Sequence, residues 1–66
     1  MAMTFPSEVE IGDLIYMGSD GWLPVFAIHP PAGTKTTYDF RVGREGSRNA
    51  ITRACLADQK IDVRQT

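Results

Sequence analysis

The feature that most constrains the fold is an Asp-Gly pair, Asp20-Gly21, between two apolar runs in GDLIYMGSDGWLPVFAI. Such a pair is typical of a tight hairpin, because aspartate and glycine tolerate the positive φ angles that a type I′ turn requires. We therefore predict strands at about residues 13–17 and 22–28, joined by this turn. Both faces of the second strand are apolar, as in a bent strand of a small barrel. Pro24 lacks an amide donor, which predicts an edge or a bulge there.

The second half of the chain contains a further alternating strand and an ambiguous segment. Between residues 36 and 42, aromatic and β-branched residues alternate with polar ones, as in a strand with one buried face. Residues 50–59 fit either a strand or a short helix that begins after Asn49. We favour the strand, because the alternating residues 60–64 form a final strand that needs a neighbour for pairing.

A chain of 66 residues allows a single domain, and it buries only about 60% of the surface that the unfolded chain exposes. Its single cysteine, Cys55, excludes an internal disulfide, so a barrel, a long sheet or a partner must supply the missing stability. Hydrophobic residues make up 42% and charged residues 23%, which is the balance of a globular protein. We expect a flexible lead-in at residues 1–8 and one domain at residues 9–66.

No segment predicts secretion or membrane insertion. The first ten residues lack the basic residue and the long apolar run of a secretory signal. The longest nearly apolar run, WLPVFAI, is far shorter than the roughly 20 residues of a transmembrane helix. We therefore expect a cytoplasmic protein that has no membrane partner.

The predicted order of strands resembles that of SH3-like small β-barrels. The resembling stretches are VEIGDLI at residues 9–15, the Asp-Gly-Trp turn at residues 20–22 and LADQKIDV at residues 56–63. The resemblance implies an all-β, five-stranded barrel with a short 3-10 turn before the last strand. The alternative is a β-rich α+β fold with one short helix at about residues 50–59. Stand-alone barrels of this kind in bacteria and phages mostly act by binding, which is what the resemblance implies for function.

The sequence contains no complete catalytic or metal-binding set. Cys55 and His29 are the only cysteine and histidine, fewer than the four ligands of a structural zinc site. GREGSR at residues 43–48 offers glycines and arginines to a phosphate, but it lacks the Gly-Lys-Ser/Thr ending of a Walker motif. We expect no catalytic residue, metal or cofactor. An enzyme that uses a reactive Cys55 is our third hypothesis. It ranks below the two binding functions because a small cysteine is usually a core residue.

Trp22 is the leading candidate for a binding residue. A tryptophan directly after a tight turn, beside Tyr16 and Leu23, is typical of a semi-exposed anchor in a protein interface. The same tryptophan also fits a cap on an open barrel end. Our first hypothesis is a non-enzymatic protein-interaction or regulatory module of a bacterium or phage. An unknown protein would contact Tyr16, Trp22 and Leu23, and open barrel edges would also allow strand addition by a partner or a second copy.

Charge is segregated along the chain, although the net charge is only −1. The first 33 residues carry four acidic residues and no lysine or arginine, whereas the rest carry seven basic and four acidic residues. The alternative function is nucleic-acid binding through guanidinium groups at the predicted second hairpin, namely those of Arg41, Arg44, Arg48 and Arg53. A pI of about 5.6 is low for such a protein, and nearby carboxylates would neutralise several of these arginines in a solvated face.

Overall fold

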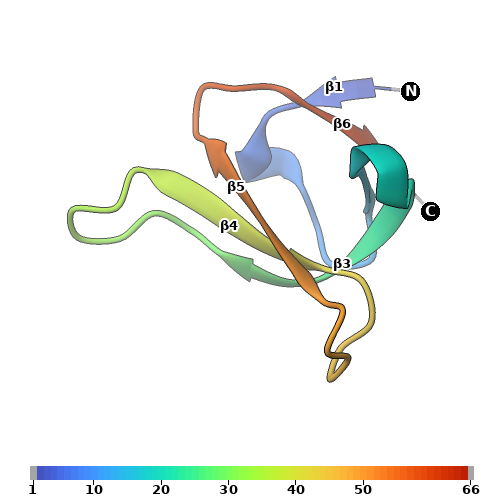
Figure 1. The fold of residues 1–66 in the computed structure, drawn as a ribbon. Helices are drawn as coiled ribbons and strands as arrows, with labels where there is room; N and C mark the ends of the chain where they lie inside the picture. The colour runs from blue at the N-terminus through green and yellow to red at the C-terminus, as the bar shows by residue number, and fades with distance from the viewer. Residues whose placement is uncertain (1, 66) are drawn as a thin grey trace.

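The computed structural model describes residues 2–65, whose strands form one open antiparallel sheet (Figure 1). The strands are β1 (Ala2–Thr4), β2 (Leu14–Tyr16), β3 (Trp22–His29), β4 (Thr37–Val42), β5 (Ile51–Leu56) and β6 (Ile61–Arg64). Two 3-10 helices, η1 (Pro6–Glu8) and η2 (Gly18–Asp20), precede β2 and β3. The order across the sheet is β1-β6-β2-β3-β4-β5. The predicted all-β class is confirmed, and the last strand lies between the first two.

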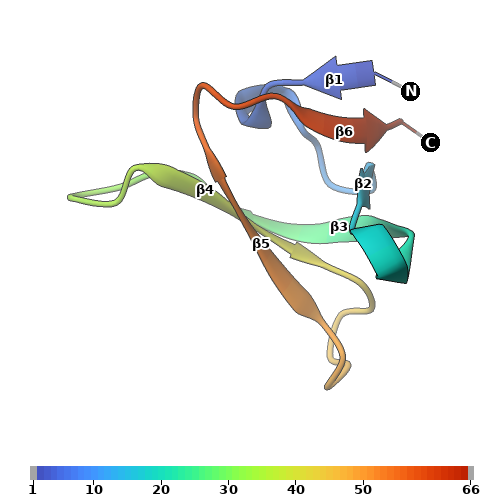
Figure 2. The ribbon, with the colours of Figure 1, turned by 45° about the horizontal axis from the view of Figure 1, so that its top comes forward.

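Strand β3 belongs to both halves of the sheet. Its first three residues pair with β2, whereas the part from Val25 onward pairs with β4, and the register shifts between Val25 and Ala27. Pro24 has no amide hydrogen, but its carbonyl accepts a hydrogen bond from the Gly43 N–H at 2.9 Å. The irregularity expected at Pro24 thus lies directly after it. Figure 2 shows the two halves, with β1 and β6 above β3, β4 and β5.

The inner faces of both halves enclose one apolar core. Phe40 and Ile15 are its largest fully buried side chains, with exposed fractions of 0% and 1%. The alternation predicted for β4 is confirmed, because Val42 is also buried and Tyr38 packs partly buried against the core. Cys55 is buried as well. The buried apolar side chains are those of Val9, Ile15, Val25, Phe40, Val42, Cys55, Ile61 and Val63.

The first predicted hairpin is confirmed, but its turn is not of type I′. Tyr16 pairs with Trp22, and the intervening loop contains η2 and closes through a 2.7 Å hydrogen bond to the Gly21 carbonyl. Asp20 does not have the positive φ that a type I′ turn requires; Gly18 and Gly21 have φ of 67° and 73° instead. A glycine at each end of the loop therefore permits a longer connection than the Asp-Gly pair predicts.

The strand favoured for residues 50–59 is confirmed by β5, so the alternative helix in that segment is wrong. Two other expectations differ from the structure. Before β6 the chain makes a single turn, in which Gln59 N–H donates to the Leu56 carbonyl at 3.0 Å, and the 3-10 helices lie earlier in the chain. Residues 2–8 of the expected lead-in contain β1 and η1, and pairing with β6 makes β1 part of the sheet.

The sheet also differs from the predicted five-stranded barrel in the number of strands. Strand β1 is the sixth, because it pairs with β6 through Met3 and Asp62 and through the residues on either side. Strands β1 and β5 are the two edges, and they do not pair with each other within residues 2–65. The sheet is therefore open between these two strands.

Candidate protein-interaction face

Tyr16 and Trp22 lie side by side on the outer face of the β2–β3 hairpin. They are direct cross-strand partners, and their ring centroids are 5.4 Å apart with the ring planes at 60°. Ile15, the neighbour of Tyr16 on β2, points to the opposite side of the sheet and is buried in the core. Tyr16 remains 46% exposed and Trp22 is half-buried. A tilted pair at this distance has a favourable ring geometry and presents a continuous aromatic surface.

An arginine from a third strand completes this aromatic pair. The guanidinium carbon of Arg64 on β6 lies 4.9 Å from the centroid of the Trp22 ring, within the range of a cation–π interaction. Pairing of Arg64 with Leu14 of β2 places it there. We call the cluster of Tyr16, Trp22 and Arg64 the aromatic face. Arg64 was not among the predicted contact residues, because strand parity alone does not reveal which strand becomes its neighbour.

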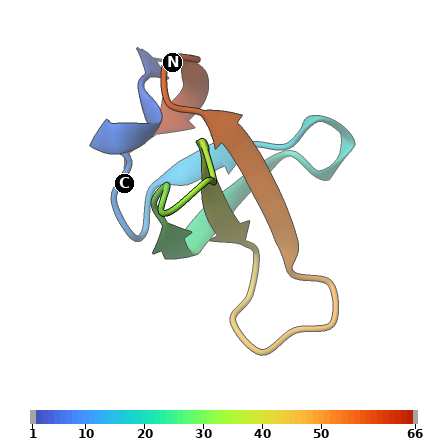
Figure 3. The same cartoon turned by 90° about the vertical axis from the view of Figure 1, so that its left-hand side faces the viewer.

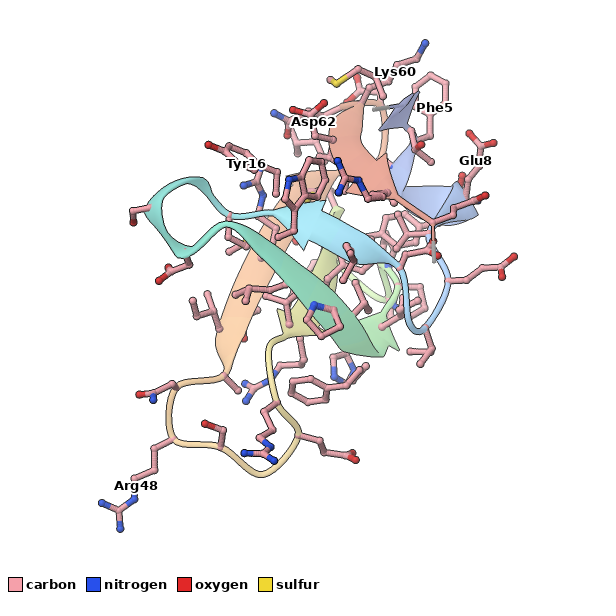
Figure 4. The ribbon with its side chains drawn as sticks, turned by 90° about the vertical axis from the view of Figure 1, so that its right-hand side faces the viewer. Phe5, Glu8, Tyr16, Arg48, Lys60 and Asp62 are labelled. Atoms are coloured by element: carbon pink, nitrogen blue, oxygen red, sulfur yellow. The ribbon has the colours of Figure 1, made fainter. Side chains whose placement is uncertain are left out.

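Asp62 and Met3 extend the outer face next to the aromatic face. Asp62 precedes Arg64 by two residues on β6 and therefore points to the same side of the sheet. Met3 is its partner on β1 and is 56% exposed. Figure 4 shows Tyr16 and Asp62 near each other in projection. The aromatic face and these two neighbours thus combine apolar groups with one cation, Arg64, and one anion, Asp62.

Leu23 does not join the aromatic face. It pairs with Ile15 and packs against the core from the inner side of the sheet. Since successive residues of a strand point to opposite faces, Trp22 and Leu23 cannot both lie outside. The structure therefore brings together two of the three predicted contact residues, Tyr16 and Trp22.

The second hairpin separates Arg41 from Arg53. Arg41 lies on the outer side, where it donates a hydrogen bond to Thr52 Oγ1 at 3.2 Å and its guanidinium carbon is 5.9 Å from the Phe26 ring centroid. Arg53 pairs with the buried Phe40 and so lies on the inner side of the same ladder. Opposite faces of a sheet cannot present both guanidinium groups to one phosphate backbone.

Arg44 and Arg48 remain together in the exposed loop between β4 and β5. In Figure 4 Arg48 lies at the lower end of the molecule and Tyr16 in its upper half, so this loop is separate from the aromatic face. Within residues 2–65, the one ion pair joins Lys35 to Asp39. A hydrogen bond from Lys35 lowers the pKa of the Asp39 carboxyl below its ordinary value of 3.8. Among the described residues, 2–65, no carboxylate forms a salt bridge with Arg44 or Arg48.

Cys55 and His29 do not meet. Cys55 pairs with Tyr38, and His29 pairs with Asp39, the next residue of β4. Neighbouring residues of one strand face opposite sides, so the thiol and the imidazole lie on opposite faces of the sheet. In the described part of the chain, no group of three or more His, Cys, Asp or Glu side chains is arranged to hold a metal ion.

Comparisons with protein families, with curated proteins and with solved structures find no match to this chain. Among residues 2–65, no helix has the length and apolar character needed to cross a bilayer. Function must therefore be inferred from the surfaces that the sheet presents. The aromatic face combines a ring pair with a cation–π contact and is the leading candidate among them.

Proposed function

We propose that this chain is a non-enzymatic, cytoplasmic protein-interaction or regulatory module of a bacterium or phage, with the aromatic face as its contact surface. The observation that carries the proposal is the tilted Tyr16–Trp22 pair on the outside of the sheet, with Arg64 against the indole. Tryptophan, tyrosine and arginine are the residues that most often dominate the energy of protein interfaces.

The proposed architecture is an SH3-like barrel with one added strand. Strands β6, β2, β3, β4 and β5 are consecutive across the sheet and would be the five barrel strands. The change of partners along β3 supports this proposal, because a strand shared by two halves is what folds a small sheet around its core. Strand β1 would be an addition at the edge next to β6.

The chemistry of the aromatic face specifies the kind of partner. Tyr16 and Trp22 would contact an apolar or aromatic side chain, while the Arg64 guanidinium would meet a carboxylate beside it. Pairing of the two rings and the cation–π contact already restrict these side chains before binding. Little side-chain entropy is then lost on association, which favours affinity from a small contact area.

The test is a quantitative capture experiment with three forms of the chain. Tyr16→Ala removes an exposed ring, while Ile11→Ala removes an apolar side chain that is 60% exposed in the turn before β2. A binding partner should be retained by the wild type and by Ile11→Ala but weakened about 30-fold by Tyr16→Ala, as for a hot-spot residue. Amide spectra would establish that each variant is folded. Equal retention by all three forms would contradict the proposal.

The loop with Arg44 and Arg48 supports a second candidate, binding of a nucleic-acid backbone. Both side chains are exposed and lack salt bridges within residues 2–65. In this case a mixed pool of short DNA and RNA should shift the amide signals of residues 43–50, and salt should reverse the shifts, because phosphate contacts release counterions. The Arg44→Ala/Arg48→Ala double variant should lose the response. Shifts at Tyr16 and Trp22 instead would favour the aromatic face.

A further inference from the structure

Strand β5 has a complete backbone edge that pairs with no strand of residues 2–65. Each of its residues pairs with β4 in one unbroken register, from Thr37↔Leu56 to Val42↔Ile51. It is the last strand in the order of the sheet, and Figure 3 shows it running along the side of the molecule. Edge strands are commonly protected from pairing by proline, lysine, a bulge or an inward-pointing charge. Strand β5 has no proline, lysine or bulge, and its one charge, Arg53, points to the inner face, which leaves the outer face of this edge without a charged residue.

We propose that β5 pairs antiparallel with β5 of a second copy of the chain, around a two-fold axis at Ala54. The two sheets would become continuous through this edge, with the same contacts made twice. This surface is separate from the aromatic face, so the proposal does not depend on the function of Tyr16 and Trp22.

Strand geometry leaves few registers for such a pair. Paired residues face the same side of a sheet, so an axis normal to the sheet must place one residue of β5 opposite its own copy. With Arg53 at the axis, two guanidinium groups would oppose each other, which is destabilising. An axis at Thr52 or Cys55 would pair only three residues of β5. An axis at Ala54 pairs residues 52–56 and places no like charges directly opposite each other, while the two Arg53 side chains become more distant, diagonal neighbours.

This register suits the side chains of the outer face. Leu56 is 51% exposed, and it would lie opposite Thr52 of the second copy. Ala54 is exposed and small, so two copies can approach closely at the axis. On the inner side, Arg53 would lie opposite Cys55 of the second copy. The pairing therefore covers an exposed leucine without bringing two bulky side chains together.

Charge at the two ends of β5 argues for a second copy as the occupant. The loop before β5 carries Arg44 and Arg48 with one acid, Glu45, while the turn after β5 carries the exposed Asp58. Antiparallel pairing places the start of one strand beside the end of the other, so the turn that carries Asp58 in one copy would lie near the loop that carries Arg48 in the second. The symmetry repeats this attraction at both ends.

Lys60, the cation in the same turn region, does not oppose this attraction at close range. Its ammonium lies 5.0 Å from the centroid of the Phe5 ring, and Figure 4 shows the two side chains together. The basic loop of one copy would therefore meet the carboxylate of Asp58 rather than a free ammonium group.

Disulfide trapping tests the register. Opposing residues of antiparallel strands have Cα atoms about 4.5 to 5.5 Å apart, within the range that a disulfide spans. Ala54→Cys should form a linked dimer under mild oxidation, at least about tenfold faster than Thr52→Cys, a matched control exposed on the same face. A mixture of Thr52→Cys and Leu56→Cys should link to each other. Equal rates for Ala54→Cys and Thr52→Cys, or wild-type linkage through Cys55, would overturn the register.

Sedimentation of unmodified protein tests the association itself. The wild type should show a concentration-dependent dimer, and Ala54→Lys should weaken it at least about tenfold by placing two ammonium groups at the axis. Ser19→Lys adds the same charge on η2, far from β5 in sequence, and should dimerise like the wild type. Amide spectra would verify that both variants fold. A wild type that stays monomeric up to about 1 mM, or a dimer insensitive to Ala54→Lys, would overturn the proposal.

Discussion

The two hairpins of this chain present surfaces of opposite kinds. The β2–β3 hairpin exposes the rings of Tyr16 and Trp22, while both of its strands are paired with further strands, β6 and β4. The β4–β5 hairpin has small or polar outer residues such as Thr52 and Ala54, and it ends in an unpaired edge. The first surface can select a partner by side-chain chemistry. The second can select only by backbone pairing and by register.

Both hairpins nevertheless contribute to one core. Removing its central side chains tests whether the two hairpins unfold together. Phe40→Ala should cost about 3–5 kcal/mol and Ile15→Ala about 2–5 kcal/mol. Small domains have only about 5–15 kcal/mol of stability, so either variant should greatly lower the urea concentration at which the whole protein unfolds. A urea titration followed by circular dichroism measures this midpoint.

Leu56→Ala is the control for these core variants. This leucine lies on the same ladder as Phe40 but is 51% exposed, so its removal should change stability by no more than about 0.5 kcal/mol. If Ile15→Ala unfolded the β2–β3 hairpin and left the amide signals of β4 and β5 dispersed, the two halves of the sheet would be independent units.

The loop of the β2–β3 hairpin depends on the backbone conformation of Gly21. Gly21 has φ 73° and ψ −147°, a conformation essentially limited to glycine. Gly21→Ala should therefore destabilise the protein by about 1–3 kcal/mol, measured by urea denaturation. Ser19→Ala in the same loop should be close to neutral, because Ser19 is exposed and has a negative φ. A neutral Gly21→Ala would show that the loop can rearrange freely.

The arginines of the two hairpin regions should also behave differently. Arg64→Ala removes the cation from the Trp22 ring and should cost about 0.5–1 kcal/mol and shift the tryptophan fluorescence. Arg48→Ala, in the exposed loop of the second hairpin, should change neither stability nor fluorescence. Equal effects of the two substitutions would mean that Arg64 does not hold the indole in place.

The smallest expected effect is a pH dependence that arises from the pair of Lys35, in the β3–β4 connection, and Asp39 on β4. The hydrogen bond from Lys35 lowers the pKa of Asp39 below 3.8, so this pair stabilises the fold above that value. The contribution is lost as the pH falls through the lowered pKa. Lys35→Gln should return the Asp39 pKa toward 3.8 in a carboxyl NMR titration. Lys60→Gln, which removes a cation near Phe5, should leave the titration of Asp39 unchanged.

Local sequence patterns predicted those elements that depend on neighbouring residues, namely single strands and hairpins. The alternation between residues 36 and 42 predicted β4, and the Asp-Gly pair predicted the first hairpin although not its turn type. Alternation along β3 also places Trp22 and Leu23 on opposite faces of the sheet. An exposed Trp22 therefore predicts a core position for Leu23, which the three predicted contact residues did not take into account. Strand β1 was missed because three residues carry too little pattern.

Long-range pairing accounts for the remaining differences. The contact between Arg64 and Trp22 exists because β6 lies beside β2, and no feature near either residue specifies that neighbour. Likewise, Arg41 and Arg53 were expected at one end of a hairpin, which holds for the backbone, but the register with Phe40 sends Arg53 inward. Which strands become neighbours, and in which register, is decided by the whole chain.

The position of β6 between β1 and β2 also sets the order in which the chain can fold during synthesis. Strands β2, β3, β4 and β5 each pair with the strand made just before or after, so they can assemble as they leave the ribosome. Strand β1 has no partner until β6 exists, and the core lacks Ile61 and Val63 until then. Incomplete chains expose apolar surface and unpaired edges, the condition that leads to aggregation. Strand β1, which is made before the other strands of this sheet, therefore pairs last, and β6 completes the core.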